Sequence, residues 1–307
     1  MRRLVLALAL LALASPVLAV TVPTDATRVY DVHAQRFVTE TTLVDALASA
    51  RLRLLGEIHD DPEHHEIRAR LLHEMAGRGS HPAVVMEQFD FDHDASLRAA
   101  QRAHADPDRI ATAGALDRKG WQWPLHRPIV AQALASDLPL RAGNLSRAAL
   151  SGNLDAVLRA RPRLAKRLHA AAWTNGQAKA LQDDIAAGHC NMLPDAIVPK
   201  LVLAQRMRDA AMAQALVDDA TADGAVLIAG NGHVRNDLGV PVYLHAPGLP
   251  GAQARSISVG FLEASADEMR AEGFPQPLIA SNPGFDYVVV TPPIARPDPC
   301  EAFRRAR

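Results

Sequence analysis

The sequence predicts an α/β fold: a mainly parallel β-sheet flanked by helices, with an inserted smaller α-helical subdomain. Four continuous apolar runs are bounded by turn residues, as expected for strands buried on both faces of a parallel sheet. A helical pattern separates the first two runs, and a long stretch without strand character separates the last two. The four runs lie at residues 51–58, 82–89, 138–144 and 224–233.

The helical pattern between the first two runs extends from about Pro62 to Gly77. Asp60 or Asp61 can cap its start, Pro62 suits the first turn and a glycine suits the end. Strand, helix, strand is the repeating unit of an α/β sheet. Three later strands are predicted at residues 240–245, 255–262 and 285–291.

The stretch of residues 146–219 is rich in alanine, leucine, arginine and glutamine. It contains no convincing strand pattern, so the simplest interpretation is a helical subdomain inserted between two strands. Its longest helix should lie within residues 193–220, interrupted or started at Pro199. The breaks between its helices are expected at Pro162, Gly176, Gly188 and Pro194.

The first residues have the character of a secretory signal peptide, with two arginines, a short apolar core and a small residue at position 19. We predict residues 1–19 as the signal peptide and residues 20–307 as the mature α/β domain. The apolar run is too short to favour a membrane-spanning helix. No cysteine lies near the cleavage point, so a lipid anchor is not expected, and the mature protein should be exported and soluble.

Composition excludes some functions. Lys and Arg number 33 against 34 Asp and Glu, and the pI is near 6.9. A nucleic-acid partner is not expected, because phosphate binding requires a basic excess. Only two cysteines occur, Cys190 and Cys300. In an oxidising compartment they could form one disulfide, which depends on a distance that the sequence does not give.

Polar residues lie where three of the apolar runs end: Glu57 and His59, then Glu87, then Asn231 and His233. In open parallel sheets, ligands bind beyond the carboxyl ends of the strands. One sheet can therefore bring these distant residues to one edge.

Two carboxylates and two imidazoles allow two chemistries. Glu57, His59, Glu87 and His233 could bind a divalent metal ion that lowers the pKa of a bound water. Without a metal, a histidine could act as general base beside an orienting carboxylate. Two of these residues also have a simpler interpretation, in which Glu57 caps a turn and His59 bonds to the backbone. The histidines of the following helix are interpreted as a mainly solvated face: His64, His65 and His73.

Five sequence blocks in this order and spacing resemble the ChaN-like haem-binding proteins, which share a superfamily with the Tiki proteases and the erythromycin esterases. The resemblance covers about residues 29–262. The blocks are "GEIHDDPEHH", "VVMEQF", "HCNMLP", "AQRMRDAAMA" and "AGNGHVRNDLGVPVYL".

The resemblance implies a periplasmic protein of haem or iron uptake, with haem as cofactor. It further implies that two protomers of a homodimer could share haem through tyrosine and histidine, and that an outer-membrane receptor or transport protein could be a partner. The cysteine that anchors many ChaN proteins to lipid is missing here. The haem-binding candidates are Tyr30, Tyr243, Tyr287, Arg235 for the propionates, and Asn231.

Three interpretations follow. In the first, the protein binds haem. In the second, Glu57, His59, Glu87 and His233 form a hydrolase site of the Tiki or esterase type, with or without a metal. A water activated by His59 or by the metal would then attack an ester or amide, and His233 would assist the leaving group. In the third, these residues are inert structure. We favour binding, because the nearest resemblance is to the binders.

Overall fold

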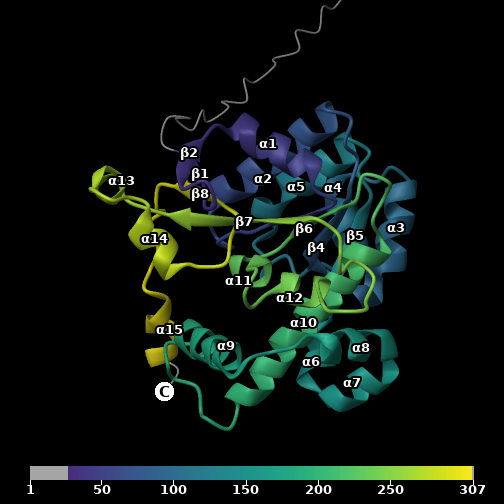
Figure 1. Cartoon of the computed structure of the whole chain (residues 1–307). Coiled ribbons are helices and arrows are strands. Elements are labelled where there is room, and N and C mark those ends of the chain that lie inside the picture. Colours follow the sequence, from purple (N-terminus) through teal and green to yellow (C-terminus); the bar gives the residue numbers. More distant parts are fainter. Residues whose placement is uncertain (1–26, 306–307) are drawn as a thin grey trace, which may run out of the picture.

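The computed structural model describes residues 27–305, whose strands form one eight-stranded sheet between layers of helices (Figure 1). The strands are β1 (Arg28–Asp31), β2 (Arg36–Val38), β3 (Leu52–Leu55), β4 (Ala83–Asp90), β5 (Leu140–Asn144), β6 (Ala225–Ile228), β7 (Ser256–Glu263) and β8 (Tyr287–Thr291). Their order across the sheet is β2-β1-β8-β7-β3-β6-β4-β5.

The sheet is mainly parallel, which confirms the predicted fold class. Strands β8, β7, β3, β6, β4 and β5 pair in parallel, while β1 pairs antiparallel with β8 and with β2. In the centre, Leu54 of β3 aligns with Leu227 of β6 and Ser258 of β7. All four residues of β3 and of β6 are buried, as the continuous apolar runs indicated.

Sixteen helical segments are described. They are α1 (Glu40–Ser49), α2 (Pro62–Gly77), η1 (Phe91–His93), α3 (Asp94–Arg102), α4 (Pro107–Ala113), α5 (Trp123–Ala135), α6 (Arg147–Ser151), α7 (Leu154–Ala160), α8 (Pro162–Ala170), α9 (Asn175–Gly188), α10 (Val198–Asp218), α11 (Asn231–Val234), α12 (Val240–Leu244), α13 (Ala266–Arg270), α14 (Gln276–Ser281) and α15 (Pro299–Arg305). Helix α2 has the predicted bounds, with Asp61 as its cap and Pro62 in its first turn.

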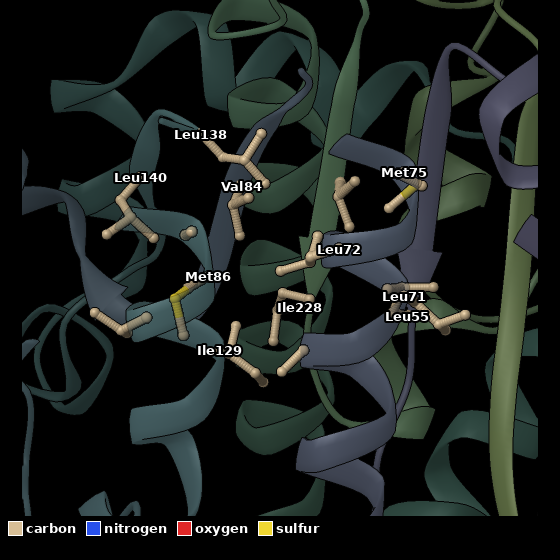
Figure 2. Packing of buried hydrophobic residues seen from close by; sticks show 14 of the residues in the cluster. Leu55, Leu71, Leu72, Met75, Val84, Met86, Ile129, Leu138, Leu140 and Ile228 are labelled. Carbon is tan, nitrogen blue, oxygen red and sulfur yellow. The ribbon is translucent and has the colours of Figure 1, made fainter. Parts of the chain in front are cut away.

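One hydrophobic core lies between the sheet and helices α1, α2 and α5. Figure 2 shows Leu71, Leu72 and Met75 of α2 in one cluster with Leu55, Val84 and Ile228. Leu71 and Leu72 lie four and three positions before Met75, which places all three on one face of the helix. Burying each large apolar side chain contributes about 1.5–3 kcal/mol. The sheet and α2 are therefore held in a fixed relation.

A second core lies on the other face of the sheet, against α10, α12 and α8. Helices α6 to α10 follow one another between β5 and β6, in the place of the predicted helical insertion. Pro199 stands in the first turn of α10, so it starts that helix and does not interrupt it. The inner face of α10 is built from Met207, Met212 and small alanines. These small side chains let the helix lie close to the sheet.

One predicted strand is wrong. Residues 240–244 form helix α12, although valine and tyrosine favour strands. Gly239 stands at the N-cap and Pro241 in the first turn, where its missing N–H costs nothing. Tyr243 and Leu244 are fully buried in the second core. The packing of this short helix therefore outweighs the local preference. Strands β7 and β8 do form where strands were predicted.

The C-terminal segment lies along the molecule and is attached at two points (Figure 1). Arg296 binds the carboxylates of Asp60 and Glu263, each through two contacts of 2.6–2.8 Å. Cys300 forms a disulfide with Cys190, just after α9, so the bond that the sequence left open is present. The predicted signal peptide lies outside the described residues. No helix within residues 27–305 has both the length and the apolar character needed to cross a bilayer.

Candidate functional site

Strands β3, β6 and β4 are neighbours, and their carboxyl ends bring Glu57, His59, Glu87 and His233 together at one edge of the sheet. Glu57 and His59 follow β3, Glu87 lies in β4, and His233 lies in α11 directly after β6. Parallel register explains the convergence, because all three strands end on the same side.

The first pair, called the rim pair below, is Glu57 with His59. The two atoms Glu57 Oε1 and His59 Nδ1 are 2.5 Å apart. The carboxylate is buried, whereas half of the His59 side chain is exposed. The imidazole also meets the edge of Trp121, with ring centres 5.1 Å apart. Within residues 27–305, His59 Nε2 makes no hydrogen bond, so this nitrogen is open to a ligand.

The second group, called the buried triad, is Glu87, His233 and Asp209. His233 Nε2 lies 3.1 Å from Glu87 Oε1, and His233 Nδ1 lies 2.6 Å from Asp209 Oδ1. Glu87 Oε2 also accepts a hydrogen bond of 2.9 Å from the Gly230 amide. All three side chains are less than a tenth exposed.

Two carboxylates around one imidazole favour its charged form. Burial lowers the pKa of His233, but Glu87 and Asp209 outweigh burial and raise the pKa to about 10. Burial raises the pKa of Glu87, yet the charge of His233 holds it well below its usual range. For Asp209 burial dominates and raises the pKa to about 6. The two carboxylates therefore favour the protonated form of His233 at neutral pH.

Gly230 connects the rim pair to the buried triad. Its amide donates a hydrogen bond to Glu87 Oε2. A Cβ atom at this position would lie 2.9 Å from His59 Cε1 and 3.0 Å from His59 Nε2. Cε1 and Nε2 of the His59 ring thus lie close to a residue without a side chain. A larger residue would push the imidazole away.

The interpretation of the α2 histidines as solvated is wrong for two of the three. His64 and His65 are fully buried, and only His73 is exposed. His64 Nδ1 accepts from the Ile58 amide at 3.0 Å. Because the buried face of α2 is turned towards the site and the sheet, desolvation lowers the pKa of His64 to about 3 and that of His65 to about 4.

Behind the rim pair lies an inner cluster of His65, Arg68 and His126. Within the described residues, Glu57, His65 and His126 form the one group whose ligand atoms all lie within 4.8 Å of one another. It shares only Glu57 with the four predicted metal ligands. However, Arg68 Nη2 contacts Glu57 Oε2 and lies 2.8 Å from His65 Nδ1. The guanidinium already supplies the positive charge there, so a metal ion would compete with it.

The three tyrosines lie away from this site. Tyr30 of β1 is buried and accepts from Gln276 at 3.0 Å, and Tyr243 of α12 is fully buried and accepts from Arg206 at 3.0 Å. Tyr287 opens β8, at the amino edge of the parallel strands and so opposite the site. None of them presents an exposed hydroxyl beside His59.

The other two haem candidates are already engaged. Arg235 binds Asp237 at 2.7 Å and Asp184 at 2.7 Å, which links α11 to α9. The side chain of Asn231 exchanges two hydrogen bonds with the backbone of Phe261 in β7. Both residues therefore have structural partners within the described chain.

Sequence reasoning missed Arg68, His126 and Asp209. A signal existed for Arg68, because it lies one position after Ile67 and three before Leu71, on the apolar face of α2. Asp209 likewise lies among buried methionine and alanine residues of α10. A charged residue on an apolar face needs a partner, and that need could have drawn attention to both. His126 shows a comparable pattern, because it lies three positions from both Trp123 and Ile129 on the buried face of α5.

Comparisons with known proteins agree with this fold. The chain matches a solved structure described as cofacial haem binding to ChaN of Campylobacter jejuni, with a TM-score of 0.65 and 19% identity over 87% of this chain and 97% of the other. Two weaker matches follow. The type III effector HopBA1 gives a TM-score of 0.41 and 12% identity over 82% of this chain and 93% of the other. A mutant of the erythromycin esterase EreC in its open conformation gives a TM-score of 0.39 and 16% identity over 88% of this chain and 83% of the other. No curated protein sequence matches the chain.

The family comparison is more specific than the structural one. Residues 43–244 match the family described as haem-binding uptake, Tiki superfamily, ChaN. The matched region contains every member of the rim pair, the buried triad and the inner cluster. On this match, which spans most of the chain, the protein belongs to the ChaN family of haem-binding uptake proteins in the Tiki superfamily.

Proposed function

We propose that this protein binds haem through His59 and serves haem-iron uptake outside the cytoplasm. The observation that carries the proposal is the rim pair, in a chain whose family is described by haem-binding uptake. Half of the imidazole is exposed, and its Nδ1 is held by a buried carboxylate. Histidines that bind metals in proteins commonly donate their second nitrogen to such a partner.

The surroundings of His59 also suit a porphyrin. Trp121 offers an apolar surface beside the imidazole, and the absence of a side chain at Gly230 lets the imidazole occupy its position. Bound haem would supply an iron that accepts the Nε2 lone pair. His233 is less suited to this role, because its side chain is buried and each of its nitrogens lies against a carboxylate.

A tyrosine ligand from this chain finds less support. Burial raises the pKa of Tyr243 well above its usual range, which disfavours the phenolate that binds iron. Tyr30 is equally enclosed, and Tyr287 belongs to the opposite edge of the sheet. A second His59 from another protomer, or an external ligand, would complete the coordination of a haem shared in a homodimer.

The test is a visible-absorption titration of haemin into the purified mature protein. A saturable spectral shift is expected for wild type and for Tyr30→Phe, Tyr243→Phe and Tyr287→Phe, and its loss is expected for His59→Ala. Light scattering with and without haemin will show whether two protomers share the ligand. Failure of wild type to bind haemin at micromolar concentration would refute the proposal.

Export and location are part of the same proposal. The N-terminal sequence supports secretion to the periplasm by a signal peptide. Transfer of haem would then involve an outer-membrane receptor or a transport protein. N-terminal sequencing of the protein from a periplasmic fraction should begin at Val20. A product that keeps its first residues would contradict export by this route.

A second candidate function is hydrolysis, and the charge state of His233 favours it. An imidazolium held between two carboxylates could protonate a leaving group, while His59, oriented by Glu57, takes a proton from water. A panel of aryl esters and peptides, with and without added divalent metal, tests this function. Activity that His59→Ala leaves unchanged would exclude the rim pair as its source.

A further inference from the structure

We propose that Arg68 and His65 are positioning residues that fix His59 as its Nδ1–H tautomer, so that the Nε2 lone pair faces the surface. The inference deepens the proposed function, because it says what prepares His59 for haem. Neither residue reaches the surface, since both are fully buried. Arg68 acts on the His59 side chain through Glu57, and His65 contacts the backbone carbonyl of His59.

The contacts form a closed cycle of residues that includes His59. The His59 side chain donates to Glu57 Oε1, and Arg68 Nη2 forms an ion pair with Glu57 Oε2 and donates to His65 Nδ1. His65 Nε2 then lies 3.0 Å from the His59 carbonyl oxygen. His65 and Arg68 are three residues apart on α2 and therefore share one face of that helix. This cycle of contacts starts and ends at His59.

The acceptors decide which nitrogen carries each proton. A carbonyl oxygen only accepts, so His65 Nε2 must be the donor and His65 Nδ1 the acceptor for Arg68. Both oxygens of Glu57 face N–H groups: Arg68 on one side, and His59 with the Gln88 amide at 3.5 Å on the other. An ionised carboxylate in that setting accepts from His59 Nδ1. The proton of a neutral His59 is then on Nδ1, and Nε2 keeps its lone pair.

Burying Arg68 costs free energy that an apolar side chain at this position would not. Its Nε and Nη1 atoms are buried without a hydrogen-bond partner in the described part of the chain. Leaving such donors unsatisfied is expensive, and a methionine would pack at similar volume. What the guanidinium adds, and methionine would not, is the link between Glu57 and His65.

The direct measurement is the ¹⁵N spectrum of histidine-labelled protein without haem. Two-bond couplings and nitrogen shifts distinguish the Nδ1–H from the Nε2–H form. Wild-type His59, identified by the signal missing in His59→Gln, should show the Nδ1–H form alone. Finding the Nε2–H form, or a mixture, in wild type would overturn the proposal without any further variant.

Variants then test the role of Arg68. Arg68→Met should give His59 signals of both tautomers, and haemin should bind about 10- to 100-fold more weakly. Arg68→Lys keeps the charge but offers one nitrogen in place of a fork, so an intermediate result is expected. Arg70→Met is the matched control: Arg70 lies on the same helix but binds Glu40 at the surface. Its His59 signal should stay unchanged.

The outcomes separate structural support from positioning. If Arg68→Met only lowers stability and His59 keeps a single Nδ1–H signal, Arg68 is structural and the proposal fails. If Arg68→Met does not fold, Arg68→Lys decides by the same criterion. If wild-type His59 has the expected tautomer but haemin does not bind, the proposed function fails while the positioning role stands.

Discussion

The rim pair and the buried triad combine the same chemical groups in opposite ways. Glu57 with His59 leaves half of the imidazole exposed, whereas Glu87 with His233 and Asp209 leaves only 8% of the His233 side chain exposed. His59 has one carboxylate and an open Nε2, while His233 has a carboxylate on each nitrogen. One imidazole is presented to ligands and the other is fixed as a cation.

The difference shows that a histidine's partners and burial, more than its position after a strand, decide its role. Both histidines follow a buried strand at the same edge of the sheet. The second carboxylate comes from α10, which precedes β6 in the chain, and it reaches His233 but not His59. Helix α10 therefore distinguishes two sites that the sheet alone would make alike.

The largest expected effect is on stability when the buried triad is broken. His233→Ala should lower the free energy of unfolding by about 3–5 kcal/mol, because it leaves Glu87 and Asp209 buried without their cation. His59→Ala should change it by less than about 1 kcal/mol, since that side chain is half exposed. Urea unfolding monitored by circular dichroism measures both. Equal losses would remove the contrast between the two groups.

The buried triad should also make the free energy of unfolding fall as the pH rises above neutral. His233 has a pKa near 10 in the folded chain against about 6.5 when unfolded. The folded chain therefore holds a proton that the unfolded chain releases, and this contribution is complete below pH 6.5 and lost as pH rises to 10. The slope should reach about 1.4 kcal/mol per pH unit. In Glu87→Gln/His233→Gln the decline should flatten, and an unchanged slope would assign it to other groups.

Gly230→Ala tests the contact between the rim pair and the buried triad. The new Cβ would meet the His59 ring, which can swing outwards because it is half exposed. We expect a loss of about 1 kcal/mol in stability and roughly tenfold weaker haemin binding, since Nε2 is displaced. Gly232→Ala provides the control, because nothing lies within 4 Å of the Cβ it would add. Comparable haemin affinities for both variants would show that the His59 position is not critical.

The smallest effect is expected for Tyr243→Phe. It removes the hydrogen bond from Arg206, which should cost about 1 kcal/mol, and leaves haemin binding unchanged. Thermal unfolding and the haemin titration provide the two readouts. A lost spectral shift in this variant would move the iron ligand from the rim pair to the interior.

The sequence predicted the elements whose signals are local. Continuous apolar runs located β3, β4, β5 and β6, because a strand buried on both faces needs apolar side chains throughout. A cap, a proline and a glycine bounded α2. The region of α12 was misassigned, since its valines favour a strand and only the packing of Tyr243 and Leu244 makes it a helix.

For the candidate site, the sequence by itself determined which residues end the central strands, because strand ends follow from local patterning. Parallel pairing then made Glu57, Glu87 and His233 neighbours. Only the tertiary structure decided their charge and exposure. Asp209 reaches His233 from a helix 24 residues earlier in the chain, and Arg68 reaches Glu57 from the buried face of α2. Burial and charge pairing are properties of the assembled layers, and no short stretch of sequence contains them.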